Sequence, residues 1–269
     1  MRDFEKHIEL VLPTLLLFTI ILVIPQLNNS NLMLPTQSGK AFGFLWGMLG
    51  YVVVVIFIAT IDKKAHTIKI TPIDLFLGAY CLMIGISYWL HPTDKLEMLS
   101  FGALILFYLS VRAIHKNYLR FLLLAVVISG TIQAIYGNLQ LWGYYPSNHG
   151  LFKMTGSFFN PGPYAGYLCA ILPIAVGLYF GRIKNVSVVE KVIDTIKIPN
   201  NKNISNSKVL NLSTLSNILN GIALISIISI ALVLPASRSR AAWLGAIVGC
   251  FYIFQIFKPF FKQRNPQTT

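Results

Sequence analysis

The sequence predicts an all-α, polytopic integral membrane protein, a bundle of about eight transmembrane helices. Of its 269 residues, 55% are apolar and 12% are charged, where an ordinary soluble domain has about 25% charged residues. The mean hydropathy is +0.65. Apolar runs of about 20 residues, the length that crosses a bilayer, recur along the chain. A lipid bilayer is therefore the expected surroundings of this protein.

The same composition excludes several other classes of protein. Abundant Leu, Ile, Val and Phe exclude an intrinsically disordered chain. Three cysteines in 269 residues exclude a disulfide-rich scaffold. Because Cys81, Cys169 and Cys250 all lie inside apolar runs, we interpret them as small residues of the membrane core.

Eight segments are long and apolar enough to span, or nearly so. They are roughly 9–27, 41–61, 72–90, 96–111, 119–142, 161–181, 218–235 and 241–257. The fourth is short and contains Glu97. The first lacks a small-residue cleavage site and carries Pro13 and Pro25, so we expect a retained helix and not a signal peptide.

The basic residues predict the orientation. The chain has 22 Lys and Arg against 9 Asp and Glu, a net charge of +13. With a cytoplasmic N-terminus and alternating spans, seventeen basic residues fall inside and only five fall outside. These five are Lys40, Lys95, Lys153, Arg238 and Arg240. The positive-inside rule thus favours cytoplasmic N- and C-termini. The basic excess is mostly topological, so no nucleic-acid partner is expected.

Three regions follow from the spans: helices one to four (1–118), a second transmembrane region (119–257) and a cytoplasmic tail (258–269). Within the second region, the composition of 182–217 predicts a flexible cytoplasmic linker. Small residues at a spacing of four predict close packing of helix backbones. They are Gly39, Gly43 and Gly47; Gly162 and Gly166; and Ala241, Gly245 and Gly249.

The first unusual outside segment runs from Trp142 to Tyr164 and combines glycine, proline and aromatic residues with few charges. An aromatic belt at the membrane surface does not require its G-S-F-F-N-P-G-P core. Asn160 is a good N-cap, and Pro161 and Pro163 suit the first turn of a helix. We expect the free N–H groups of such a helix start to be able to receive a phosphate.

The second unusual segment, P-A-S-R-S-R-A-A-W from Pro235 to Trp243, places two arginines in a short outside turn. Charges beside the membrane are costly without a partner, and a guanidinium matches phosphate oxygens bidentately. We therefore interpret Arg238 and Arg240 as functional, against the alternative that they extend to lipid head groups.

The remaining polar candidates have simpler interpretations. His91 and His149 face outside and are candidates for proton handling, although solvated loop histidines explain them as well. Asp74 follows Pro72 at a helix start, where a carboxylate complements the helix dipole. Capping is therefore favoured there over a proton or ion site.

The two outside segments together resemble the O-antigen ligase and polymerase superfamily. The resemblance consists of G-S-F-F-N-P-G-P-Y-A-G-Y at 156–167, a span with Pro173, a basic loop, a further span and S-R-A-A-W-L at 239–244. It covers about 120–257; residues 1–119 match only as generic spans. It implies a GT-C-like membrane glycosyltransferase of the bacterial inner membrane.

The family resemblance also implies a reaction and its residues. A glycan on undecaprenyl diphosphate is transferred, at the periplasmic face, to a lipid A-core acceptor, without a nucleotide sugar, metal or other cofactor. Arginines neutralise the diphosphate leaving group, as preorganised positive charge does in other active sites. The expected catalytic residues are Arg240 and, as its neighbour, Arg238. The expected substrate-binding residues are Gly156, Phe158, Asn160, Pro161, Lys153 and His149.

The sequence departs from the family in one respect. Family members have a large periplasmic loop after the arginine-bearing region, with a second arginine and a histidine that activates the acceptor. This sequence reaches Thr269 without such a loop. We expect it to correspond to the N-terminal portion of such an enzyme, and the 269-residue chain alone to be incompetent for transfer.

Two alternatives stay open from the sequence. An O-antigen polymerase, or a ligase that loads glycans onto protein, would use the same donor and a different acceptor. A transporter or flippase for lipid-linked glycan would use the arginines only to bind and release the diphosphate. A downstream loop with His and Arg would favour the enzyme, and an inverted second half would favour the transporter.

Overall fold

A computed structural model of the chain describes residues 2–28, 35–61, 70–91, 95–181 and 212–264. Every regular element in these ranges is a helix. Their bounds are α1 Arg2–Val23, the 3₁₀ turn η1 Ile24–Gln26, α2 Pro35–Ile61, α3 Pro72–Leu90, α4 Lys95–Ala113, α5 Lys116–Leu141, α6 Pro161–Phe180, α8 Leu212–Ala236 and α9 Arg240–Arg264.

The predicted all-α membrane class is confirmed at this level. Seven of the helices in the described ranges, α2 to α6, α8 and α9, are long and apolar enough to cross a membrane, and α1 together with η1 contributes a shorter apolar stretch, Val11–Gln26. Large side chains such as Trp46, Phe76 and Trp89 are exposed on the outside of the bundle. Lipid is the solvent that such a surface requires. The chain is therefore a multi-pass membrane protein.

Two predicted regions overlap helix ends. α8 begins at Leu212, within the predicted cytoplasmic linker 182–217, and α9 continues to Arg264, within the predicted cytoplasmic tail 258–269. The location of both regions stays a prediction. A polar or basic turn can extend a helix beyond its apolar part, and hydropathy does not detect that extension. The other parts of these two predictions, 182–211 and 265–269, lie outside the described residues.

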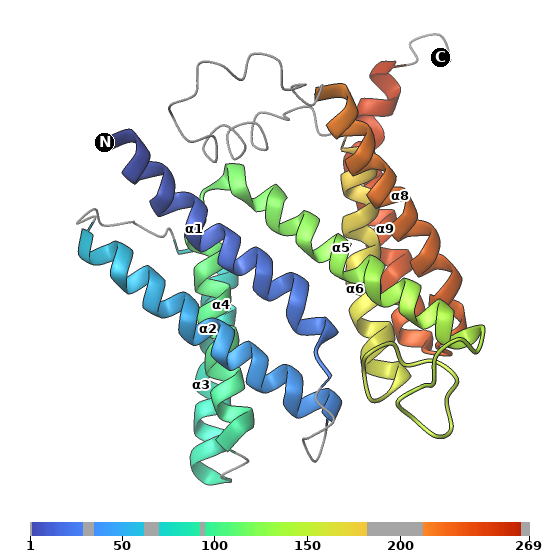
Figure 1. Cartoon of the computed structure of the whole chain (residues 1–269), viewed down its shortest axis with the longest axis horizontal. Helices are drawn as coiled ribbons and strands as arrows, with labels where there is room; N and C mark the ends of the chain where they lie inside the picture. Colours follow the sequence, from blue (N-terminus) through green and yellow to red (C-terminus); the bar gives the residue numbers. More distant parts are fainter. Residues whose placement is uncertain (1, 29–34, 62–69, 92–94, 182–211, 265–269) are drawn as a thin grey trace.

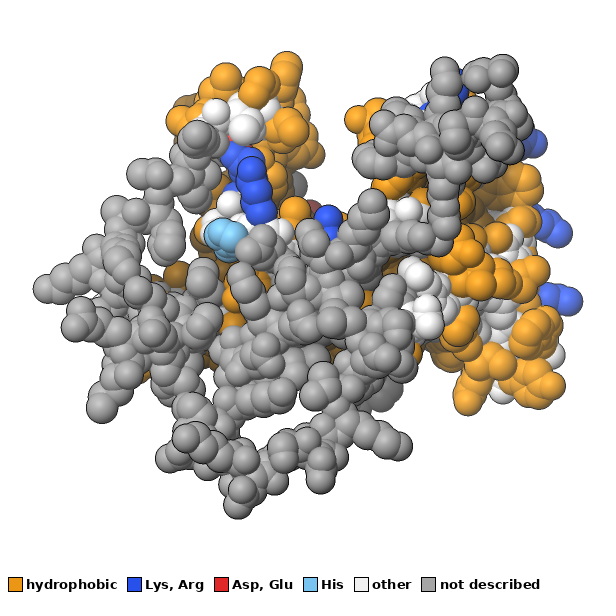
Figure 2. All heavy atoms as spheres, turned by 90° about the horizontal axis from the view of Figure 1, so that it is seen from above, with side chains coloured by type: hydrophobic (Ala, Val, Ile, Leu, Met, Phe, Trp, Pro, Cys, Tyr) orange, Lys and Arg blue, Asp and Glu red, His pale blue; other side chains and the backbone are white. Residues whose placement is uncertain are grey.

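The helices form two groups joined by α5 (Figure 1). α5 packs against α1 on one side and α8 on the other, and α6 packs against α8 and α9. α2 packs against α1 and α4. One apolar core lies among α5, α6, α8 and α9, and a second lies among α1, α2, α4 and α5. In the view from above, most of the described side chains are hydrophobic and a few are Lys or Arg (Figure 2).

Glycines explain several of the close helix contacts. A Cβ on Gly47 would lie 3.1 Å from Ile20 Cγ1, one on Gly245 would lie 2.8 Å from Cys169 Sγ, and one on Gly249 would lie 2.5 Å from Pro173 Cγ. These contacts confirm the predicted close packing for two of the three small-residue series. Gly166 contradicts it for the third, because its Cβ position has no neighbour within 4 Å.

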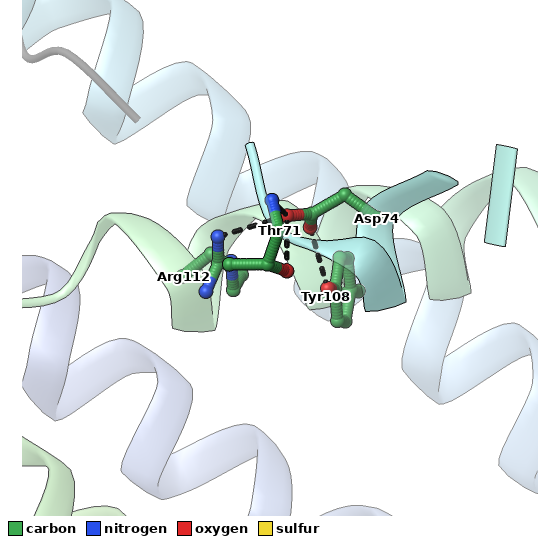
Figure 3. Close-up of polar contacts among 4 residues, drawn as sticks. All are labelled: Thr71, Asp74, Tyr108 and Arg112. Carbon is green, nitrogen blue, oxygen red and sulfur yellow. Dashed lines mark hydrogen bonds and ion pairs between the residues drawn. The ribbon is translucent and has the colours of Figure 1, made fainter. Parts of the chain in front are cut away.

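α3 is attached to α4 by a polar cluster (Figure 3). The Asp74 carboxylate and Thr71 form the capping box that begins α3, so the predicted capping role is confirmed. The same carboxylate accepts hydrogen bonds from Tyr108 Oη at 2.6 Å and Arg112 Nη2 at 3.0 Å. These two partners on α4 are not predictable from the local sequence around Asp74.

Candidate functional site

Both unusual segments lie at the same end of the bundle. α5 and α8 run toward this end, and α6 and α9 run away from it, so loop 142–160 and turn 237–239 both lie at the lower end of Figure 1. The end of η1 and the beginning of α2 are also there. We call this the motif end.

Side-chain amides fold the loop. Gln140, buried at the end of α5, accepts hydrogen bonds at Oε1 from Thr155 N (3.0 Å) and Gly156 N (2.8 Å). Its Nε2 donates to Pro146 O (3.0 Å) and Gly156 O (3.1 Å). Asn148 Nδ2 donates to Gly156 O as well (3.1 Å). One buried glutamine side chain thus accepts hydrogen bonds from backbone N–H groups of the loop and donates hydrogen bonds to its backbone carbonyls.

A second group of polar contacts attaches the loop to η1. Ser157 N donates to Gln133 Oε1 at 3.0 Å, and Ser157 Oγ donates to Pro25 O at 2.5 Å. Gln133 Nε2 donates to Pro25 O at 3.1 Å and to Gln26 Oε1. Gln26 Nε2 in turn donates to Ser129 Oγ at 2.8 Å. Residues more than 100 positions apart in sequence therefore hold loop 142–160, which we call the motif loop, in place.

Lys40 is a functional candidate that sequence reasoning grouped only with the outside charges. Near the start of α2, its Nζ donates to Leu27 O at 2.6 Å and Ser157 O at 2.8 Å. It also lies 5.2 Å from the ring centroid of Phe158, within range of a cation–π interaction. Its position within a glycine-rich, apolar stretch was the available signal, because such surroundings are unusual for a solvated lysine.

The matched G-S-F-F-N-P residues shape the loop. Gly156 has φ +56°, and a Cβ there would lie 2.4 Å from the ring of Tyr164. The half-buried Phe158 ring packs 5.5 Å from that of Tyr167. Glycine is required at position 156 because its φ is positive and because a Cβ would collide with the ring of Tyr164. Phe158 contacts both Lys40 and an aromatic residue of α6.

The beginning of α6 confirms one prediction and overturns another. Asn160 is the N-cap and accepts a hydrogen bond from Gly162 N at 2.9 Å, and Pro161 is the first helical residue. Pro161 and Pro163 have no N–H, and Tyr164 N donates to Asn160 O. The expected free N–H groups are therefore absent from positions 161–164, where two residues are prolines and the other two N–H groups are hydrogen-bonded. These four positions offer no free backbone donor to a phosphate.

The arginine turn between α8 and α9 has a defined geometry. Arg238 has φ +56° and its N–H donates to Pro235 O at 3.2 Å. Ser237 Oγ donates to Leu234 O at 2.6 Å, and Trp243 Nε1 donates to the same oxygen at 2.9 Å. Both Arg238 and Arg240 are exposed. Among the described residues, the ion pair is that of Arg112 with Asp74, so neither exposed arginine is paired with a carboxylate of these ranges.

The other two predicted binding residues differ in setting. Lys153 is exposed in the loop. His149 Nδ1 accepts a hydrogen bond from Leu151 N at 3.1 Å, and its ring lies 4.8 Å from that of Phe152. His149 therefore orders the loop locally. Within the described ranges, no group of three His, Cys, Asp or Glu residues could hold a metal ion.

These features define a multi-pass helical membrane protein with a hydrogen-bonded loop and an arginine turn at one end. No protein-family model matches the chain, and no curated protein or solved structure matches it. The function is therefore argued from the site.

Proposed function

We propose that this chain is the donor-binding membrane region of a GT-C-like, O-antigen ligase-type glycosyltransferase of the bacterial inner membrane. The motif end would face the periplasm. The observation that carries the proposal is the arginine turn with the start of α9, where Arg238 and Arg240 are exposed beside apolar spans and form no ion pair with a carboxylate of the described ranges. A lipid diphosphate is an anion that reaches this level of the membrane.

The proposed chemistry assigns these arginines to the leaving group. An acceptor hydroxyl attacks the anomeric carbon of the lipid-linked glycan and forms the new glycosidic bond. The bond from that carbon to the diphosphate oxygen breaks, undecaprenyl diphosphate leaves, and a base takes the hydroxyl proton. Because negative charge grows on the departing diphosphate, the Arg240 fork would bind the transition state more strongly than the donor.

The loop contacts support this assignment indirectly. Lys40, Gln133 and Gln140 hold the motif loop through buried hydrogen bonds, which is the preorganisation that a site for a charged group needs. Phe158 and Gly156 serve the same structural purpose, and Lys153 supplies exposed positive charge. The acceptor, proposed to be lipid A-core, is not specified by any contact in this region.

The test uses membranes that contain the full gene product and a radiolabelled glycan on undecaprenyl diphosphate. We expect Arg240→Ala to slow cleavage of the glycan–phosphate bond by about 100-fold or more, the effect of removing one charge-stabilising donor. Arg240→Lys should also impair cleavage, because the bidentate fork is lost. Transfer by the Arg240→Ala protein at the original rate would overturn the assignment.

The control is Arg120→Ala, which removes an exposed arginine from the other end of the bundle, near the start of α5. Its transfer rate should be unchanged. The same assay addresses the transporter alternative, because a transporter moves the lipid-linked glycan without cleaving it. Lipid-linked glycan that crosses the membrane uncleaved would overturn the enzyme proposal.

A further inference from the structure

α1 contacts α5 through apolar side chains at the end far from the motif loop. The Phe18 ring of α1 stacks on that of Phe121, with 4.2 Å between the ring centroids, and Val11 packs against Tyr118. α1 and α5 run in the same direction (Figure 1), and Gln133 follows Phe121 by twelve residues. Because a helix rises about 1.5 Å per residue, this apolar contact lies about 18 Å along α5 from Gln133.

At the motif end the two groups of helices meet through the polar atoms of Ser157. Its N–H donates to Gln133 Oε1 on α5 at 3.0 Å, and its Oγ donates to Pro25 O in η1 at 2.5 Å. Its carbonyl oxygen accepts from Lys40 Nζ on α2 at 2.8 Å. The residue is only 6% exposed. Each polar group of Ser157 thus has a partner on a different element, and we call Ser157, Gln133, Pro25 and Lys40 the latch.

The latch uses the carbonyl end of the segment formed by α1 and η1. The last carbonyl groups of a helix have no partner within the helix. Here Pro25 O accepts from Ser157, and Leu27 O accepts from Lys40 Nζ at 2.6 Å. A cation at this end of a helix is also favoured by the helix dipole. The Lys40 ammonium therefore connects this segment to the motif loop.

The two groups of helices have separate apolar cores, which share only α5. One core lies among α5, α6, α8 and α9, and the other lies among α1, α2, α4 and α5. Within a bilayer, apolar helix surfaces gain little by meeting each other, because lipid chains are as apolar as the side chains they replace. Hydrogen bonds and close packing then hold helices together. The hydrogen bonds of the latch would have to break for the groups to part at the motif end.

We propose that the latch is a conformational device that opens the motif end, with the contact of Phe18 and Phe121 as the pivot. Opening moves the motif loop away from η1 and α2. The loop stays attached to α5, because Gln133 and Gln140 bind its backbone N–H groups. Access to the motif end therefore depends on the position of α1 and α2. This inference is independent of the proposed function, since it concerns the position of the loop and not its ligand.

Distances between pairs of spin labels test the latch. They are measured by pulsed electron paramagnetic resonance on the purified full-length protein in nanodiscs, after the three native cysteines have been replaced by alanine. One pair, Phe42→Cys on α2 with Leu232→Cys on α8, spans the motif end. A second pair, Phe57→Cys on α2 with Ile218→Cys on α8, spans the far end. All four positions are exposed, so labels there leave the two cores intact.

The latch is weakened by combining Lys40→Met with Ser157→Ala, which removes the hydrogen bonds from the Lys40 ammonium and the Ser157 hydroxyl. We expect the population with a longer distance at the motif-end pair to rise by about tenfold or more, because several buried hydrogen bonds favour the closed state. The far-end pair should keep its distance, because the pivot is unchanged. Should the double variant fail to fold, Lys40→Met alone should show a smaller rise at the same pair.

Asn148→Ala is the matched control. Asn148 Nδ2 donates to Gly156 O and Phe158 O, so its removal weakens the motif loop internally and leaves the latch intact. The motif-end distance should therefore stay as in the unchanged protein. Equal lengthening in this control and in the latch variant would overturn the proposal. Unchanged distances in both latch variants would overturn it too, because the polar contacts would then belong to a fixed core. Equal lengthening at both label pairs would rule out the pivot.

Discussion

Asp74 on α3 forms an ion pair with Arg112 on α4, with 3.0 Å between Oδ2 and Nη2. The same carboxylate caps α3 through Thr71 and accepts a hydrogen bond from Tyr108 (Figure 3). α3 has no buried residue of its own. This cluster therefore supplies a large part of the protein contact that fixes the position of α3.

Asp74→Asn should destabilise the protein. The amide has one acceptor oxygen in place of two and carries no charge, so hydrogen bonds from Thr71, Tyr108 or Arg112 are lost at a site only 20% exposed. We expect the unfolding temperature to fall, because hydrogen bonds to a charged group are removed. Thermal unfolding in detergent measures it. Glu97→Gln, at an exposed carboxylate in the first turn of α4, is the control; an equal loss there would contradict the explanation.

Gly156→Ala should disrupt the motif loop more than the same change at Gly143. Both glycines have positive φ, +56° and +84°, so both alanines are strained by about 1 kcal/mol or more. Only the Cβ at 156 would also collide, at 2.4 Å from Tyr164 and 2.8 Å from Gln133 Oε1, whereas the Cβ at 143 has no neighbour within 4 Å. Limited proteolysis of the loop compares them. Equal cleavage rates would show that backbone strain alone accounts for the effect.

Helix positions could be predicted from sequence because they depend on local patterns. Apolar runs indicated the spans, and Asn160 before Pro161 predicted the first residue of α6 correctly. The partners of Lys40 and Gln133 could not be predicted, because Ser157 is 117 and 24 residues away and no periodicity relates them. The use of the helix start was predicted wrongly, since the prolines that favour that start also remove the N–H groups that a phosphate needs.

Lys40→Met should loosen the loop without unfolding the bundle. Methionine keeps most of the side-chain volume but leaves Leu27 O and Ser157 O without their donor. We expect amide hydrogen exchange at Ser157 and Gly156 to accelerate by about tenfold or more, because opening the loop then costs one or two fewer hydrogen bonds.

Lys95→Met is the control for this measurement. Lys95 is an exposed lysine at the beginning of α4, and its removal should leave exchange in the loop unchanged. Exchange at Ser157 that stays slow in Lys40→Met would mean that Gln133 alone protects this amide.

Gln140→Glu should be destabilising although the two side chains have nearly the same shape. The carboxylate can still accept from Thr155 N and Gly156 N, but it places a second acceptor opposite Pro146 O and Gly156 O. Pro146 O loses its donor, whereas Gly156 O keeps the hydrogen bond from Asn148 Nδ2, and both carbonyls face a carboxylate oxygen; we expect a loss of about 1–3 kcal/mol in total. Lowering the pH should restore part of the stability, because a protonated carboxyl can donate one hydrogen bond. Gln37→Glu, at an exposed position in α2, should show neither effect in thermal unfolding.

Gly249→Ala and Gly221→Ala should change stability in opposite directions. Both glycines lie inside long helices, where alanine is favoured by about 0.5–1 kcal/mol. At Gly221 the added methyl group meets nothing within 4 Å, so this gain should appear in full. At Gly249 it would lie 2.5 Å from Pro173 Cγ on α6, and the proline ring cannot rotate away, so overpacking of about 1–3 kcal/mol should exceed the gain.

A thiol-reactive dye in a thermal ramp detects unfolding through the free cysteines Cys169 and Cys250. Unfolding of both variants at a higher temperature would mean that α6 and α9 can separate at no cost, contrary to the packing described above.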